Sequence, residues 1–370
     1  MKTDVIFLGA GASLSAGFPT NKDLTNYIIY QMSPNQRFTS SGQTKTSFDQ
    51  KLAQQIQSDK WPKLKERLRR SGFLSVDEFC QLAKEKPEMV LDMKRMLRVA
   101  LFDHTRGWFQ NNDYRTFVES LFVKPASTEL NPRFTVVNFN YDGLLGKLLT
   151  DSVIERCLVA GKNPPSDQKL AGWAGGYYVS TEAAKFMLAT ESDGVEQDEF
   201  AHHMLHGTFV AVREGKYVYS LSNAIYARDG SDGVDEFSQH YSFEPLIHFP
   251  WELDERGDLY KRQYAHATES VRQAKRIHFI GISGHPLLTS SLMRICGAFH
   301  PHELQSKDWH IATPDDKKQT FHRILECIFG QAQCQRADFT MYRTEFLRQT
   351  RLFEYNNFEH WLRESPHLKP

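Results

Sequence analysis

The hydrophobic pattern alternates between short apolar runs and longer segments with helical spacing. Four runs are rich in β-branched and aromatic residues, as is typical of buried strands, and cover residues 4–8, 134–139, 277–282 and 309–312. Residues 217–221 alternate in the manner of a half-buried strand. Strands that alternate with helices predict an α/β fold with a doubly wound, mostly parallel, Rossmann-like sheet. In such a sheet, ligands bind beyond the carboxyl ends of the strands.

Helical spacing separates these predicted strands. It follows the first strand at residues 24–30 and the second at 144–149. A further helix is expected over residues 313–329, where Pro314 and Asp315 suit a helix amino terminus. The chain therefore has the alternating order of elements that a parallel sheet requires.

A long block between the first two strands has a different character. It contains amphipathic segments, the clearest of which places apolar residues at helical spacing at Met89, Met93, Met96, Leu97 and Leu101. We expect a helical insertion that forms a smaller domain, a Gly-rich loop or lid at 151–201, and a carboxyl-terminal helical extension. The predicted parts are a main domain at 1–34 and 131–330, the insertion at 35–130, and the extension at 331–370.

Composition narrows the class of protein. The 45 basic and 45 acidic side chains cancel, which removes the positive charge typical of dedicated nucleic-acid-binding proteins. No apolar run approaches the roughly 20 residues that a membrane helix needs, and no signal peptide precedes the first strand. The five cysteines are scattered and odd in number, and no histidine cluster has partners at metal-ligand spacing. We therefore expect a cytoplasmic protein without a disulfide framework, a membrane anchor or a metal.

A glycine-rich turn, Gly9-Ala-Gly11-Ala-Ser13, follows the first predicted strand. Glycines there allow the backbone to approach a pyrophosphate at a helix amino terminus. The usual dinucleotide motif has a small residue three positions after its second glycine, and this chain has Leu14 there. A turn that needs glycine only for its backbone conformation is the alternative interpretation.

Polar side chains follow the second predicted strand, and a histidine precedes Gly207. The amide of Asn140 can orient a water or a sugar hydroxyl, and His206 can accept a proton near neutral pH. Asp142 can stabilise positive charge or hold a neighbouring side chain. Alternatively, Asn140 and Asp142 cap the helix that begins near Gly143, and His206 is an ordinary turn residue.

Four motifs in this order resemble those of the sirtuin superfamily. They are Gly9-Ala-Gly-Ala-Ser-Leu-Ser-Ala-Gly17-Phe-Pro19-Thr, Val137-Asn-Phe-Asn140-Tyr-Asp142, Leu205-His206-Gly207 and Ile280-Gly281-Ile-Ser283. The chain is most similar to divergent bacterial sirtuin-like proteins that hydrolyse NAD⁺ in anti-phage defence. The resemblance covers residues 4–30 and 134–330.

The resemblance implies a sirtuin-type domain in which NAD⁺ is the substrate. It implies that the second and third motifs surround the bond between nicotinamide and ribose, with Asn140, Asp142 and His206 as the catalytic residues. It further implies that the first and fourth motifs hold the nucleotide, through Gly9, Ala10, Gly11, Ala12, Ser13, Gly17, Pro19, Gly281 and Ser283.

Two departures distinguish the chain from protein-deacylating sirtuins. Pro19 is followed by Thr20-Asn21, where those enzymes have a Phe-Arg pair, and the paired Cys-x-x-Cys zinc ligands are missing. If the helical block and the loop at 172–176 cover the site, water becomes the expected acceptor. We therefore expect an NAD⁺ glycohydrolase that releases nicotinamide and ADP-ribose.

The resemblance also implies a biological role. The protein would be the NAD-depleting effector of a bacterial anti-phage, abortive-infection system, acting as a homo-oligomer or with a co-encoded partner such as an ATPase. One alternative is a zinc-less NAD-dependent deacylase or ADP-ribosyltransferase. Another is a non-catalytic module that senses NAD or ADP-ribose, although such a module has no need of Asn140 or His206.

Overall fold

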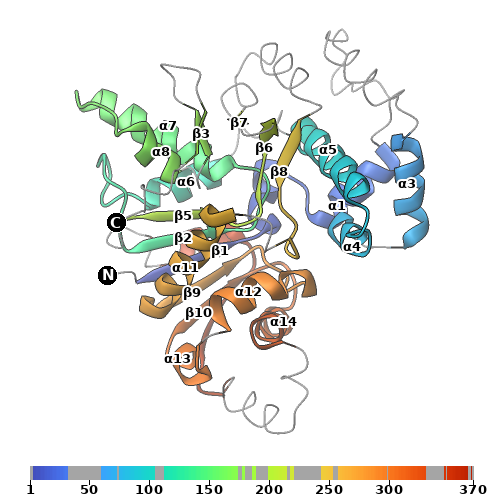
Figure 1. The fold of residues 1–370 in the computed structure, drawn as a ribbon. Helices are drawn as coiled ribbons and strands as arrows, with labels where there is room; N and C mark the ends of the chain where they lie inside the picture. Colours follow the sequence, from blue (N-terminus) through green and yellow to red (C-terminus); the bar gives the residue numbers. More distant parts are fainter. Residues whose placement is uncertain are drawn as a thin grey trace.

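The fold is known from a computed structural model of the chain (Figure 1). The structure describes residues 3–31, 60–72, 75–104, 112–173, 177–179, 186–188, 199–214, 217–220, 243–252, 257–297, 299–330, 346, 348–365 and 368.

A six-stranded, all-parallel sheet lies at the centre, with the strand order β11-β10-β9-β1-β2-β5 (Figure 1). The strands are β1 (Asp4–Leu8), β2 (Phe134–Asn138), β5 (Ala201–Met204), β9 (Arg276–Ile280), β10 (Asp308–Ala312) and β11 (Arg351–Tyr355). The chain begins at β1, adds β2 and β5 on one side, and then adds the other three strands on the opposite side of β1. This order is that of a Rossmann fold, with the reversal between β1 and β9, and it confirms the predicted fold class.

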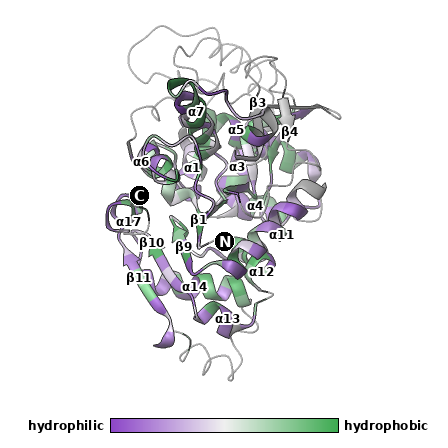
Figure 2. Cartoon of the chain, turned by 90° about the vertical axis from the view of Figure 1, so that its left-hand side faces the viewer, coloured by the Kyte–Doolittle hydropathy of each residue, from purple (hydrophilic) through white to green (hydrophobic). Residues whose placement is uncertain are grey.

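Both faces of the sheet are covered, because β1 directs successive side chains to opposite faces. Val5 and Phe7 join one hydrophobic cluster, in which the Phe7 and Phe279 rings stack at 4.7 Å between centroids. Helices α11 (Gly257–Gln273), α12 (Thr289–Cys296) and α14 (Lys317–Phe329) supply apolar side chains to this cluster. Ile6 and Leu8 join the cluster on the other face. Figure 2 shows hydrophobic and hydrophilic positions mixed along α12 and α14, as expected of helices that cover a sheet.

The described part of the expected insertion at 35–130, between β1 and β2, contains four helices. They are α3 (Lys60–Ser71), α4 (Val76–Leu82), α5 (Pro87–His104) and α6 (Asn112–Ser120). Their apolar side chains, such as Leu68, Met93 and Phe117, belong to the same cluster as Ile6 and Leu8 of the sheet. The described part of the block contains these helices and a non-helical end at 121–130, and its core is continuous with that of the sheet. Its organisation as a separate smaller domain therefore stays a prediction.

Among the described residues, two small antiparallel sheets accompany the central one. The predicted strand at 217–221 is β7 (Tyr217–Ser220), with residue 221 outside the described residues. It pairs with β6 (Gly207–Glu214), which also pairs with β8 (Glu244–Ile247), so β7 does not belong to the parallel sheet. Strands β3 (Tyr177–Val179) and β4 (Phe186–Leu188) form the second small sheet.

The prediction of a loop or lid at 151–201 is wrong for the first part of that range, which contains two helices. Helix α7 runs from Leu144 to Val159, and α8 (Asp167–Trp173) follows it. The second half of α7 has few buried side chains, chiefly Val153 and Cys157, so its polar residues conceal the helical pattern. Residues 174–176, 180–185 and 189–198 of the expected loop lie outside the described residues.

The helix expected at 24–30 is present, with its start at Asn21, whereas the helix expected from residue 313 begins later. Helix α1 (Asn21–Asn26) begins after Thr20, whose hydroxyl accepts a hydrogen bond from Asp23 N, and a π-helical turn η2 (Tyr27–Gln31) follows. Helix α14 begins at Lys317 because Asp316, rather than Pro314 or Asp315, accepts the capping hydrogen bond.

The carboxyl-terminal segment, for which we expect a helical extension, also contains a strand. It contributes β11 to the sheet before α17 (Phe358–Glu364). Strand β11 lies at an edge of the sheet and most of its side chains are exposed or half-buried, so it lacks the continuous apolar pattern of a central strand.

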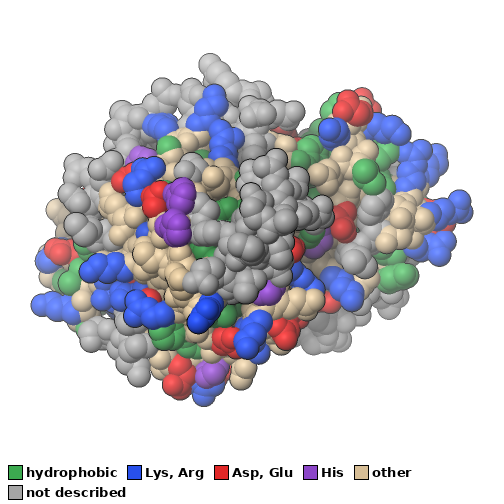
Figure 3. Space-filling model, turned by 90° about the horizontal axis from the view of Figure 1, so that it is seen from below, with side chains coloured by type: hydrophobic (Ala, Val, Ile, Leu, Met, Phe, Trp, Pro, Cys, Tyr) green, Lys and Arg blue, Asp and Glu red, His purple; other side chains and the backbone are tan. Residues whose placement is uncertain are grey.

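Charge is unevenly spread although the chain is neutral. Figure 3 shows Lys and Arg side chains gathered at the end of the molecule where α3 lies, and mixed charges elsewhere on that face. Among the described residues, no helix is long and apolar enough to cross a membrane.

Candidate functional site

All four sequence motifs lie at one edge of the sheet, beyond the carboxyl ends of β1, β2, β5 and β9. Backbone hydrogen bonds tie the loops together past the ends of the strands: Gly9 N donates to Ile280 O, and Phe139 N donates to Leu8 O, each at 2.9 Å. Leu205 N donates to Asn138 O at 3.0 Å. The edge that carries the motifs is therefore held rigidly around the reversal point between β1 and β9.

The glycines of the first and fourth motifs pack against one another. A Cβ atom at Gly9 would lie 2.6 Å from Gly281 O, and one at Gly281 would lie 2.1 Å from Ala12 N. Gly281 also has a positive φ of 65°. These glycines are needed because the β1 and β9 loops approach too closely for side chains.

Three amide groups of the glycine turn are used within the protein. Gly9 N donates to Ile280 O, Gly11 N to Gly281 O and Ala12 N to Gly9 O. The turn continues into a 3₁₀ helix, η1 (Ala10–Ala16), which ends at Gly17 with φ 85°. Close packing of two loops thus explains the glycines without a phosphate, and these three amides do not support the predicted cradle.

The other predicted nucleotide-binding residues differ in their exposure. Ala10, Gly11, Pro19 and Gly281 are half-buried, whereas Gly17 and Ser283 are exposed and Ala12 is buried. Ser13 is also buried, and unlike the others it makes several side-chain contacts.

Ser13 stands at the centre of a buried polar cluster. Its hydroxyl donates to Asp142 Oδ2 at 2.5 Å and accepts from Asn140 Nδ2 at 2.9 Å. The hydroxyl of Tyr114, on α6, lies 3.0 Å from Ser13 Oγ. Because the only hydroxyl proton of Ser13 goes to Asp142, Tyr114 is the donor in this contact. The structure thus joins Asn140 and Asp142 through Ser13, and the four side chains are each at most 5% exposed.

Burial controls the electrostatics of the cluster. It raises the pKa of the Asp142 carboxyl, although hydrogen bonds from Ser13 and Leu144 N favour the ionised form. It also raises the pKa of the Tyr114 phenol, as does the nearby charge of Asp142. Leu144 N donates to Asp142 Oδ1 at 2.9 Å, so Asp142 bonds the first amide of α7, although the residue at the N-cap is Gly143. The amide of Leu144 and the hydroxyl of Ser13 therefore bind different oxygens of this carboxyl.

Asn140 leaves one polar atom of the cluster unused. Its Nδ2 is bonded to Ser13, but its Oδ1 is buried and has no hydrogen-bond partner among the described residues. A buried acceptor without a donor costs about 1–3 kcal/mol. A water, a sugar hydroxyl or a carboxamide N–H could supply that donor. This oxygen is the clearest position in the cluster for a ligand group.

His206 forms a second polar group beyond the end of β5. It is buried, its ring lies 5.0 Å from that of Phe139 and 6.1 Å from that of Tyr141, and its Nε2 lies 3.2 Å from Ser291 Oγ. A Cβ atom on Gly207 would lie 1.9 Å from Leu246 O, which explains the glycine after the histidine. His206 is connected to the first cluster through the Tyr141 segment.

Helix α4 contributes two acidic residues that sequence analysis missed. Asp77 Oδ2 accepts hydrogen bonds from Asn21 Nδ2 at 3.2 Å and from the Tyr141 hydroxyl at 3.4 Å. Burial, aided by the charges of Glu78 and Glu252, raises the pKa of Asp77 to about 7 despite the bond from Tyr141.

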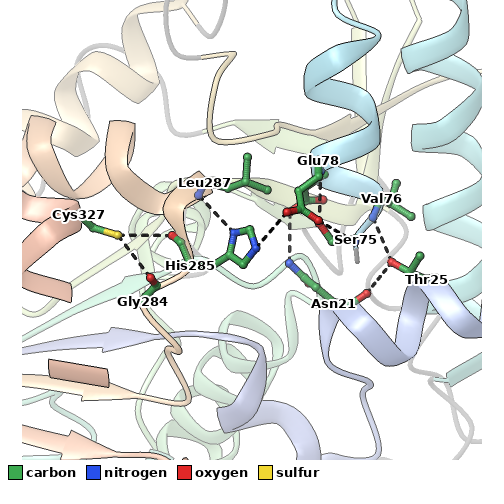
Figure 4. A network of polar contacts seen from close by, with 10 residues as sticks. Asn21, Thr25, Ser75, Val76, Glu78, Gly284, His285, Leu287 and Cys327 are labelled. Atoms are coloured by element: carbon green, nitrogen blue, oxygen red, sulfur yellow. Dashed lines mark hydrogen bonds and ion pairs between the residues drawn. The ribbon is translucent and has the colours of Figure 1, made fainter. Parts of the chain in front are cut away.

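Glu78, the next residue of α4, contacts a different part of the chain from Asp77. It completes the capping box with Ser75 and contacts His285 Nε2 at 3.4 Å (Figure 4). The start of α4 therefore contacts the second motif itself and the segments that follow the first and fourth motifs.

Tyr114 was also missed. Tyr114 and Asp77 lie in the helical block, far in sequence from every motif, and nothing local to either residue marks it. Only the fold brings them to the site. The Tyr114 ring packs against Phe358 of α17 at 5.3 Å, so the carboxyl-terminal helix supports it from behind.

The described residues contain no group of three or more histidine, cysteine or acidic side chains that could hold a metal. In comparisons with known proteins, no protein-family model and no curated sequence matches the chain. The sirtuin resemblance therefore stays a prediction based on the four motifs.

Proposed function

We propose that the protein is an NAD⁺ glycohydrolase, which cleaves the bond between nicotinamide and ribose to give nicotinamide and ADP-ribose. The observation that carries the proposal is the buried cluster of Ser13, Asn140, Asp142 and Tyr114, with one open acceptor, beside the reversal point of a Rossmann sheet. Sheets with this strand order bind dinucleotides at that point.

The chemistry of the cluster suits glycosidic cleavage. Departure of nicotinamide leaves positive charge on the ribose, so the site needs a negative or dipolar group and a fixed nucleophile. Asp142 supplies the carboxyl group, and Asn140 Oδ1 can accept a hydrogen bond from a ribose hydroxyl or from the attacking water. His206, at the neighbouring strand end, is the candidate proton acceptor.

The inserted helices support water as the acceptor. Helix α6 brings Tyr114 into the cluster, and α4 brings Asp77 against Tyr141. Both helices therefore cover part of the carboxyl edge. A covered site favours a small acceptor over a protein side chain, which supports hydrolysis rather than deacylation or ADP-ribosyl transfer.

The proposed biological role rests on the sirtuin resemblance alone. We infer an NAD-depleting effector of bacterial anti-phage defence that acts in the cytoplasm. A homo-oligomer or a co-encoded partner such as an ATPase would regulate it.

The test is to incubate the purified chain with NAD⁺ and to measure nicotinamide and ADP-ribose by chromatography. Asn140→Ala should lower kcat by about 10²–10³-fold, since a positioned polar group at a reacting centre is worth that much. The matched control is Asn26→Ala, because Asn26 is exposed on α1. Transfer of ADP-ribose to a peptide would favour the transferase, NAD⁺ binding without turnover would favour the sensor, and neither binding nor turnover would refute the proposal.

A further inference from the structure

His206 belongs to a hydrogen-bonded chain that the motifs do not include. Its Nε2 lies 3.2 Å from Ser291 Oγ, and Ser291 Oγ lies 3.0 Å from the Tyr264 hydroxyl. Ser291 is in the first turn of α12, and Tyr264 is on α11. All three side chains are at most 3% exposed, with Ser291 at 0%. The chain thus runs from the end of β5 into the helical layer.

The surroundings of His206 leave its ring little freedom. Phe139 and Tyr141 lie beside it, and its carbonyl oxygen accepts a hydrogen bond from His248 N at 2.9 Å. The Arg294 guanidinium lies over the Tyr264 ring, 5.1 Å from its centroid. Tyr141, Tyr264, His248 and Arg294 are thus titratable or charged groups close to the chain.

We propose that Ser291, held by Tyr264, is the positioning residue that fixes the orientation and tautomer of His206. Each hydroxyl has one proton, so the direction in which Ser291 donates decides whether Nε2 carries a proton. The hydrogen bond at one imidazole nitrogen sets the protonation of the other. Ser291 thereby controls the tautomer in which His206 acts. This inference rests on the proposed role of His206 in NAD⁺ cleavage.

A nucleophilic role for Ser291 does not fit the same geometry. The distance to His206 is suitable for an activated serine, but the side chain is fully buried. Its hydroxyl instead contacts both the His206 ring and the Tyr264 hydroxyl, which suits a residue that holds the imidazole.

The first test is kinetic. Ser291→Ala should lower kcat for nicotinamide release by about tenfold or more, with KM changed less, since general acid–base groups contribute about 10²–10⁴-fold. Tyr264→Phe removes only one hydroxyl and should have a smaller effect in the same direction. The double variant should be no worse than Ser291→Ala, because both changes break one chain. Ser290→Ala is the matched control, since Ser290 donates instead to Pro250 O.

The second test does not depend on turnover. Nitrogen-15 NMR of the imidazoles, with the His206 signals assigned from a His206→Gln sample, should show one neutral tautomer in the wild type. It should show a mixture or the opposite tautomer in Ser291→Ala and Tyr264→Phe. Unchanged tautomer and pH–rate profile in both folded variants would overturn the proposal. If the wild type does not cleave NAD⁺, the proposed function fails. The NMR comparison of the His206 tautomer still tests the role of Ser291 in that case.

Discussion

The hydroxyl of Ser13 donates to Asp142 Oδ2 at 2.5 Å, although the two residues are 129 positions apart. This bond joins the loop after β1 to the loop after β2. It also places a single hydroxyl between a carboxyl, an amide and a phenol. Ser13 is therefore the residue whose removal disturbs the cluster most broadly.

Ser13→Ala should destabilise the fold by about 1–3 kcal/mol, because it removes the shared partner of three buried polar groups. Urea unfolding followed by fluorescence measures the change. Ser306→Ala is the control, since Ser306 is exposed and bonds only locally to Glu303 O. Equal midpoints for both variants would mean that the cluster contributes nothing to stability.

Asp77 should make the stability depend on pH. Its pKa is about 7 in the folded protein against 3.8 for the free group, so the folded state holds the proton more tightly. Stability from the neutral carboxyl is complete below about pH 4 and is lost as the pH rises towards 7 and above, by up to about 4 kcal/mol.

Asp77→Asn should abolish this dependence, since an amide does not ionise. Thermal unfolding at pH 5 and pH 8 should give a smaller Tm difference for this variant than for the wild type. Asp315→Asn, at an exposed position, should retain the wild-type difference. If Asp77→Asn also keeps the wild-type difference in Tm, Asp77 is not the group that makes stability depend on pH.

Asp4 should have the opposite effect on stability. Burial favours its neutral form, but hydrogen bonds from Arg276 at 2.5 and 2.7 Å and from His278 at 3.1 Å outweigh burial and hold the pKa of Asp4 far below its usual range. Stability from this ion pair is present above about pH 4 and declines as the pH falls further.

Arg276→Gln should therefore cost about 3–5 kcal/mol at pH 7, because it leaves a buried carboxylate without its main partner. The comparison is Arg351→Gln, which breaks an ion pair with Asp308 in which Arg351 is 71% exposed. That loss should be at most about 1 kcal/mol. Similar denaturation midpoints for the two variants would contradict the difference.

Gly281→Ala should be among the most damaging single-methyl additions. The new Cβ would lie 2.1 Å from Ala12 N, at a residue with φ 65°. We expect a loss above about 4 kcal/mol or failure to fold, measured by circular dichroism and soluble yield. Gly17→Ala has a similar positive φ of 85° but nothing within 4 Å of the new atom. It should cost only about 1–2 kcal/mol, and equal losses would show that strain alone matters.

Much of the sheet could be predicted because central parallel strands are buried on both faces and so have continuous apolar runs. The edge strand β11 could not, since most of its side chains are at least partly exposed. Asn140 and Asp142 were found because polar residues that follow a buried strand are visible in sequence. Their link through Ser13 to Tyr114 was not visible, because it depends on how α6 packs beneath the loop after β1.

The packing of Tyr114 against Phe358 has a consequence for synthesis on the ribosome. Ser13, Asn140 and Asp142 all precede Phe358 in the sequence, and Asp142 does so by 216 residues. The helix that supports Tyr114 therefore emerges long after they do. A nascent chain therefore contains every polar member of the cluster for much of its synthesis without the support that holds them together. The supported form of the cluster can therefore exist only after α17 has been made.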